Sequence, residues 1–197
     1  MDRDLAVVVA GLPHIDVHGE FERHTSESWR ERALIEGSRA GGRWAAPGTF
    51  PVIYLARPTD AVVLEAYRHL VDDGEGMTGA RVRRRYLIRA LVSATEVLDL
   101  TSAASRLEIG LTDEDLQSPI GEYSACQRVG HVAHQLNLHG VLAPSATGQG
   151  ETLALFVDYL PPAEMPIQLG DAIHWATLPA DPRRLQLLDH REEPSAG

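Results

Sequence analysis

The spacing of apolar residues along the chain predicts two clear helices. Apolar side chains recur close to the helical interval over residues 59–71 and again over residues 123–138. Thr59 or Asp60 is expected to cap the first helix, because a short polar side chain accepts hydrogen bonds from the free N–H groups of a first turn. A shorter helix is predicted over residues 101–107.

Short runs of β-branched and aromatic residues predict strands between these helices. The predicted strands cover residues 51–56, 81–100 (as one or two strands), 141–143, 152–157 and 183–188. Strands interleaved with two or three helices predict an α+β domain. No linker rich in Pro or Gly divides the chain, so we expect a single domain over residues 1–197, with a frayed polar tail at 191–197.

The charge balance narrows the classes of partner. The 197-residue chain has a formal net charge of −10, and all 18 of its basic residues are Arg. This composition disfavours nucleic-acid binding, which relies on a basic surface, and it excludes every mechanism that needs a Lys side chain. The one basic run, Arg83-Arg84-Arg85, is interpreted as a solvated strand edge or a contact to an acidic partner.

The remaining composition indicates the compartment. The longest apolar run, Leu5 to Leu12, is far shorter than the ~20 residues that a membrane helix needs, and it lacks the basic start of a signal peptide. Cys126 is the single cysteine, so an internal disulfide is impossible and a buried apolar role is expected. These features predict a cytoplasmic protein with no membrane partner.

The first candidate site lies between residues 38 and 54. In Gly41-Gly42-Arg43-Trp44, two glycines precede an arginine, and glycines let a ligand approach the backbone closely. The planar guanidinium of Arg43 suits phosphate, and the rings of Trp44 and Tyr54 suit a flat partner. The alternative, which composition alone favours, is a surface loop with a solvated arginine.

Two further polar residues lie in apolar surroundings. Glu65 interrupts the apolar pattern of the helix predicted over 59–71, and a buried carboxylate must be paired or used in chemistry. It either pairs with Arg43 or Arg23 or faces a cleft. Ser145 follows a predicted strand, and without a Gly-x-Ser-x-Gly motif around it a turn serine is favoured over a hydrolase nucleophile.

Two sets of histidines have spacings that metal sites use. Alternation along a strand would place His14, Asp16 and His18 on one face, and His131 and His134 lie one helical turn apart. No further ligand and no His-Glu-x-x-His motif accompanies either set. Polar surface or satisfied histidines are therefore favoured, and no metal site is assigned.

In their order along the chain, these motifs resemble the RES-domain family, which is named for an Arg, a Glu and a Ser. Its members are NAD-degrading toxins of toxin–antitoxin pairs. An upstream segment, Phe21-Glu22-Arg23-His24, looks like the arginine on the family's first strand, and the resemblance covers about residues 21–156. The other matching segments are Gly41-Gly42-Arg43-Trp44, Val52-Ile53-Tyr54-Leu55-Ala56, Ala61-Val62-Val63-Leu64-Glu65 and Pro144-Ser145-Ala146.

The resemblance implies a fold and a reaction. The fold would be a mixed α/β domain similar to ADP-ribosyltransferase toxins, with a central split sheet and an NAD cleft. The reaction would cleave the bond between nicotinamide and ribose in NAD, with water or inorganic phosphate as the acceptor and no separate cofactor. The partners that it suggests are a cognate antitoxin and, as an option, further copies of the chain.

The resemblance also implies which residues hold NAD. Arg23 and Arg43 would grip its pyrophosphate. Tyr54 would pack on the nicotinamide or its ribose, with Trp44 nearby. Positioning and charge stabilisation are what the cleavage needs, because nicotinamide is already a cationic leaving group.

Arg43, Glu65 and Ser145 are the residues expected to carry catalysis. Glu65 would hydrogen-bond the ribose and offset positive charge at its anomeric carbon, and Ser145 would orient the ribose, the phosphates or the acceptor. Three alternatives stay open at this point: a nucleotide-binding module without activity, a transferase of ADP-ribose to a macromolecule, and a metal hydrolase built on His14, Asp16 and His18.

Overall fold

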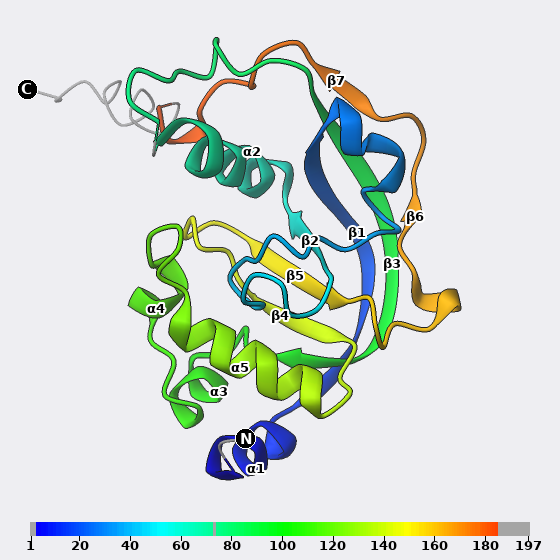
Figure 1. Ribbon diagram of the computed structural model, residues 1–197, viewed down its shortest axis with the longest axis vertical. Helices are drawn as coiled ribbons and strands as arrows, with labels where there is room; N and C mark the ends of the chain where they lie inside the picture. Colours follow the sequence, from blue (N-terminus) through cyan, green and yellow to red (C-terminus); the bar gives the residue numbers. More distant parts are fainter. Residues whose placement is uncertain (1–2, 73, 185–197) are drawn as a thin grey trace, which may run out of the picture.

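The computed structural model describes residues 3–72 and 74–184, and within them seven strands join into one strongly curved sheet (Figure 1). The two longest strands, β1 (His14–Ser26) and β3 (Arg85–Asp99), pair antiparallel along nearly their whole length. On the other side, β5 (Glu151–Phe156) pairs antiparallel with both β2 (Val52–Arg57) and β4 (Gly140–Pro144). Two antiparallel groups of strands therefore form the body of the sheet.

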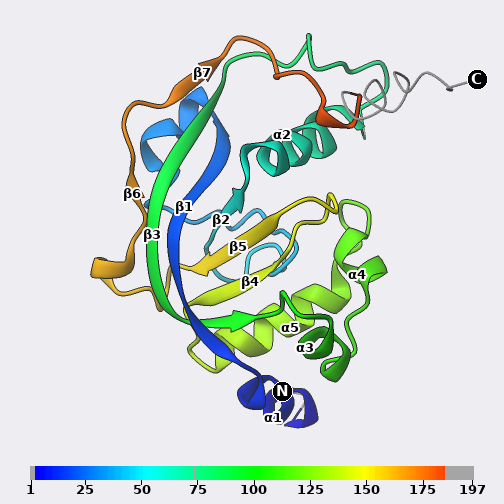
Figure 2. The same cartoon turned by 180° about the vertical axis from the view of Figure 1, so that it is seen from behind.

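These groups join at both ends, so that the sheet closes into a ring. β3 and β4 run parallel where Val97 to Asp99 meet Gly140 to Leu142, and β1 meets β2 through one residue pair, Glu22 and Ala56. The split that we expected in the sheet is therefore not a complete break in strand pairing. β1 and β2 pair at one position and then diverge (Figure 2). Two short strands, β6 (Ile167–Gln168) and β7 (Ile173–Trp175), pair with the edge of β3 that faces away from β1.

Helices cover the ring on two sides. α1 (Arg3–Gly11) and α5 (Ser124–Gln135) pack on each other, with α3 (Ala103–Glu108) and α4 (Asp113–Gln117) close by. α2 (Thr59–Tyr67) lies apart from them and packs against β1 and β2. No helix within the described ranges has the length and apolar character needed to cross a membrane.

Alternation along the strands sends side chains to two different cores. Ile53 on β2 and Leu153 on β5 belong to one cluster, which also takes apolar residues from β1, β3 and β4. Val52 and Phe156 point the other way, into a cluster shared with α1 and α5, and Cys126 is fully buried there, as predicted. Both faces of β2 and β5 are therefore buried, which fixes the position of the residues that these strands contribute to the pocket described below.

The predicted helices differ from the observed ones mainly at their ends. The helix expected over 59–71 is α-helical only to Tyr67 and continues as a π-helical turn, Arg68–Asp72. The apolar pattern continues because Leu70 and Val71 still pack under α2. The predicted cap is wrong: Pro58 occupies the N-cap position, and no side chain bonds to the first turn.

The strand predictions need two corrections. The region 81–100 forms one strand, and it begins only at Arg85, because Arg84 has a left-handed backbone (φ 56°) that interrupts an extended chain. The strand expected over 183–188 is wrong where it can be compared, since residues 182–184 are helical and the Asp181 carboxylate accepts from the Arg183 N–H. Residues 185–188 and the tail at 191–197 lie outside the described ranges.

Candidate active site

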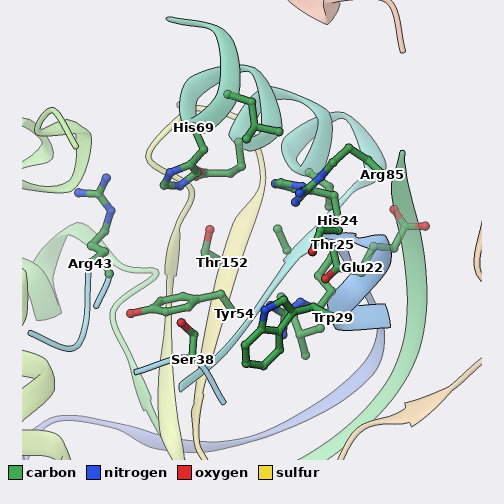
Figure 3. Close-up of a pocket in the computed structure, with 18 of the residues that line it drawn as sticks. Glu22, His24, Thr25, Trp29, Ser38, Arg43, Tyr54, His69, Arg85 and Thr152 are labelled. Carbon is green, nitrogen blue, oxygen red and sulfur yellow. The ribbon is translucent and has the colours of Figure 1, made fainter. Parts of the chain in front are cut away.

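A pocket of about 420 Å³ opens where β1 and β2 diverge (Figure 3). Its walls come from β1, the loop that contains residues 38–43, β2, α2 with its π-helical turn, and the start of β3. Four of the predicted site residues line this pocket: Arg23, Arg43, Tyr54 and Glu65. The fold thus brings together side chains from β1, a loop, β2 and α2.

Arg43 is held at one end of the pocket by two contacts. Its Nη1 donates to the backbone carbonyl of Asp115 at 3.1 Å, and its guanidinium carbon lies 4.6 Å from the centre of the Tyr123 ring. A carbonyl and an aromatic face orient a guanidinium without neutralising it. Arg43 therefore keeps its positive charge for an anionic ligand.

The loop before Arg43 lies against Tyr54. A Cβ atom at Gly42 would lie 2.7 Å from the Tyr54 hydroxyl, which is too close for any residue except glycine. The same hydroxyl accepts a hydrogen bond from the Trp44 backbone N–H at 3.1 Å. Burial raises the pKa of Tyr54, so its hydroxyl is neutral at physiological pH. Tyr54 thus both lines the pocket and fixes the loop that carries Arg43.

The sequence led us to expect Trp44 beside the pocket, but Trp44 does not line it. Its side chain is 1% exposed and packs in the cluster beneath α5. Gly130 on α5 makes room for this loop, because a Cβ atom there would collide with the Trp44 carbonyl oxygen. The large apolar ring is better buried than exposed, and it anchors the loop so that the neighbouring Arg43 faces the cavity.

Glu65 projects from α2 toward the pocket and is held by two side chains. Ser145 donates from Oγ to Glu65 Oε1 at 3.2 Å, and His69 Nε2 lies 3.6 Å from Oε2. Arg43 and Arg23, the partners considered from the sequence, instead donate to backbone carbonyls. With 20% of its side chain exposed, Glu65 is oriented by neighbours and still accessible to a ligand.

Ser145 lies behind Glu65 and does not line the pocket. It is 2% exposed, and its hydroxyl also meets Thr147 Oγ1 at 2.9 Å in the turn after β4. A ligand in the pocket reaches Glu65 before it reaches this hydroxyl. The geometry therefore favours a positioning role for Ser145 over the direct contact with ribose, phosphate or acceptor that the family resemblance implied.

Arg85 and His24 lie across the pocket from Arg43 (Figure 3), and Arg23 lines the same pocket. Arg23 donates from Nη1 to the Ala33 carbonyl, and burial with help from Arg85 lowers the pKa of Arg23 to about 10, so it remains charged at neutral pH. Arg85 Nη2 donates to His24 Nδ1 at 2.8 Å. Burial, followed by the charge of Arg85, lowers the pKa of His24 well below its usual value, so its imidazole is neutral and can accept this bond.

A model of the RES domain matches residues 17–191. The chain belongs to the RES-domain family. It is 32% identical to "NAD(+) phosphorylase MbcT" of Mycobacterium tuberculosis, over 80% of this chain and 87% of the relative. It is 31% identical to a "Probable NAD(+) phosphorylase" of the same organism, over 81% of this chain and 75% of that protein. The crystal structure of the M. tuberculosis MbcT–MbcA toxin–antitoxin complex contains a similar chain, with a TM-score of 0.73, 28% identity and coverage of 96% of this chain and 98% of that one.

The pocket of this RES domain also contains residues that sequence reasoning missed: His24, His69, Arg85 and Thr152. The sequence suggests that Arg83-Arg84-Arg85 forms a solvated strand edge or a contact to an acidic partner, and Arg83 and Arg84 are exposed. Arg85 itself is half-buried, because it is the first residue of β3 and pairs beside Ser26 at the end of β1. Its place at the start of an alternating apolar stretch was the available signal.

The histidines weighed as metal ligands lie outside the pocket of the RES domain. On β1, His14 lies 3.6 Å from Glu96, and His18 shares a hydrogen bond with Ser93 at 3.1 Å. His134 stacks on an aromatic ring of the core. Across residues 3–72 and 74–184, no three His, Cys, Asp or Glu side chains are grouped closely enough to hold a metal ion.

Proposed function

We propose that this RES domain is an NAD(+) phosphorylase, which cleaves NAD between nicotinamide and ribose and transfers the ADP-ribosyl group to inorganic phosphate. The similarity to MbcT supports the reaction class. The observation that carries the proposal is the pocket, where Arg43, Tyr54 and Glu65 converge from three separate segments. NAD is the substrate in this proposal, and no further cofactor is required.

The chemistry depends on stabilising charge. Nicotinamide leaves with the electron pair of its bond to the anomeric carbon and becomes neutral, while a phosphate oxygen forms the new bond to that carbon. The ribose passes through a transition state that resembles an oxocarbenium ion, as in glycoside hydrolysis. A fixed carboxylate beside the anomeric carbon stabilises this positive charge. Glu65, held by Ser145 and His69, supplies that carboxylate.

The rest of the pocket suits the two halves of the substrate. Arg43 supplies a charge-assisted donor for the pyrophosphate of NAD. The ring of Tyr54 lies between Arg43 and Trp29 in Figure 3 and offers a flat surface to the nicotinamide or its ribose. Arg23 also lines the pocket, and the charge of Arg85 acts on it.

A protein partner is the second part of the proposal. We infer that the chain is the toxin of a toxin–antitoxin pair, because its fold matches a chain of the MbcT–MbcA complex along nearly its whole length. The likeness to ADP-ribosyltransferase toxins also stays a proposal, and the divergence of β1 from β2 is the feature that would correspond to their cleft. An enzyme that consumes NAD fits the cytoplasm. A homo-oligomer stays a prediction.

Release of nicotinamide from NAD tests the activity directly. We expect the purified chain to release nicotinamide in phosphate buffer, with a product that mass spectrometry identifies as ADP-ribose carrying one added phosphate. Glu65→Gln removes the charge of the central carboxylate and is expected to slow release roughly 100- to 1000-fold. Glu108→Gln is the matched control, because Glu108 is an exposed residue at the end of another helix.

Each alternative function gives a different result in the same assay. Nicotinamide release that is equally fast without phosphate indicates a glycohydrolase. ADP-ribose attached to added protein or nucleic acid indicates a transferase. NAD binding without release by the wild-type chain indicates a binding module and overturns the proposed activity, and equal rates for wild type and Glu65→Gln overturn the role of that residue.

A further inference from the structure

Most of the buried polar atoms without partners belong to residues that line the pocket. Among the residues that the structure describes, five buried side-chain nitrogen or oxygen atoms have no hydrogen-bond partner, and four of them belong to residues that line the pocket. Such atoms are destabilising unless a ligand or water satisfies them, so their concentration in one cavity indicates where a polar ligand binds. The four atoms are Glu22 Oε2, Arg23 Nε, Arg85 Nε and Thr152 Oγ1.

Two of these atoms are charged donors on neighbouring strands. Arg23 bonds through Nη1 to the Ala33 carbonyl, and Arg85 bonds through Nη2 to neutral His24, so neither of these partners is an anion. Burial, followed by the nearby charge of Arg85, lowers the pKa of the Arg23 guanidinium, as expected for two neighbouring cations. Two guanidinium groups with free Nε–H donors form a site for an oxyanion.

The carboxylate of Glu22, next to Arg23 on β1, indicates which kind of oxyanion the site binds. Glu22 lines the pocket, and its Oε2 accepts no hydrogen bond from residues 3–72 or 74–184. Hydrogen phosphate can accept from both arginines and donate its own O–H to this carboxylate. The pyrophosphate of NAD carries no O–H at neutral pH and offers acceptors alone. The donor and acceptor set on this wall therefore fits inorganic phosphate better than a dinucleotide.

The position of this wall agrees with that assignment. Arg85 and His24 lie on the side of the pocket opposite Arg43, with Tyr54 and Thr152 between them in Figure 3. A phosphorylase binds two anionic reactants, the pyrophosphate of its dinucleotide and free phosphate, and two separated cationic groups give each its own site. One arginine cluster for both reactants would make them compete.

We propose that Arg23, Arg85 and Glu22 form the site for the acceptor phosphate, with Arg85 as the residue that selects phosphate over water. His24 is a positioning residue, because it holds the Arg85 fork at Nη2 and leaves Nε for the ligand. This inference rests on the proposed phosphorylase activity but makes a separate claim about which wall binds which reactant.

Steady-state kinetics with each reactant varied in turn tests the assignment. Arg85→Gln is expected to raise the KM for phosphate roughly 10- to 100-fold, the effect of losing a charge-assisted hydrogen bond, with a KM for NAD within about two-fold of wild type. Arg85→Lys retains the charge, and its KM for phosphate should lie between those of wild type and Arg85→Gln. Arg89→Gln is the matched control, because Arg89 is exposed on the same strand and does not line the pocket.

A rise in the KM for NAD that equals the rise for phosphate overturns the assignment and gives this wall to the pyrophosphate. Unchanged constants for both reactants overturn it as well. Thermal unfolding of each variant shows whether it is folded. If Arg85→Gln does not fold, Arg85→Lys and Glu22→Gln decide, since each alters the same site with a smaller change in charge or shape.

Binding of inorganic phosphate without NAD separates this inference from the proposed function. In a phosphorus-NMR titration, wild type and Arg89→Gln should bind phosphate, and Arg85→Gln should bind it at least about tenfold more weakly. Saturating ADP-ribose should leave phosphate binding in place, and full competition would refute separate sites. Phosphate binding that depends on Arg85 in a chain that never cleaves NAD refutes the activity alone, and phosphorolysis that is indifferent to Arg85 refutes the site alone.

Discussion

Removal of the Ser145 hydroxyl tests whether this residue acts through Glu65 or on the substrate itself. Ser145 is buried, donates to Glu65 and does not line the pocket. Ser145→Ala removes one of the two side chains that orient the carboxylate, together with the bonds between the hydroxyl and Thr147 in the turn after β4. We expect kcat to fall with little change in the KM for NAD.

The size of the fall follows from the length and the charge of the bond. Hydrogen bonds to charged groups contribute about 1.5–3 kcal/mol, and the strongest bonds from a hydroxyl to a carboxylate measure about 2.5–2.7 Å. The bond from Ser145 to Glu65 is 3.2 Å long, and the same hydroxyl meets Thr147. The lower end of the range therefore applies, and about 1.5 kcal/mol corresponds to about a tenfold loss of rate.

A double-mutant cycle makes this test sharp. Nicotinamide release is measured for Ser145→Ala, for Glu65→Gln and for the double variant. If Ser145 acts only by orienting the Glu65 carboxylate, the double variant is no slower than Glu65→Gln, because the carboxylate that Ser145 orients is already absent. Ser105→Ala is the control, since Ser105 is a buried serine at the start of α3, away from the pocket.

Two results would refute this reasoning. Additive losses in the double variant would mean that Ser145 contacts the substrate or the acceptor independently of Glu65. A loss for Ser145→Ala as large as that for Glu65→Gln, together with a covalent intermediate trapped on wild type, would mean that Ser145 is a nucleophile after all.

The remaining predictions concern stability. Trp44→Ala should lower the free energy of unfolding by about 3–5 kcal/mol in urea, because it empties a buried site, whereas Trp29→Ala, at a side chain 41% exposed, should change it by less than about 1 kcal/mol. Burial alone would raise the pKa of Glu164, but hydrogen bonds from Thr95 and His139 outweigh it and lower this pKa below the ordinary 4.5. The stabilisation by Glu164 is therefore complete above pH 4.5 and lost as the pH falls below it, so Glu164→Gln should flatten the acid side of a stability profile.

The sequence predicts the central strands well because both of their faces are buried. β5 is apolar from Leu153 to Phe156, so its pattern is unambiguous. β1 is different: only Val17, Phe21 and Thr25 are fully buried along it, and the intervening positions are polar. Its polar residues serve the pocket, and the strand therefore lacks the period of two that sequence patterns detect. The closure of the ring was equally hidden, since β1 and β2 touch at a single pair.

The sequence predicts one part of the candidate site and misses another. Arg43, Tyr54 and Glu65 follow one another closely in the chain, so their order as motifs suggested a common site. Arg85 and Thr152 enter the pocket only through register, because β3 places Arg85 beside the end of β1 and β5 places Thr152 opposite Ala56. Long-range register is set by the whole sheet and leaves no local signature.

The position of β5 has a consequence for the chain during its own synthesis. β5 supplies the partner of β2 along its full length and contributes Thr152 to the pocket. A nascent chain that has not yet exposed residues 151–156 leaves β2, and with it Tyr54, without this support. The ring cannot form until about four fifths of the protein has left the ribosome, so an unfinished or prematurely terminated chain lacks the pocket.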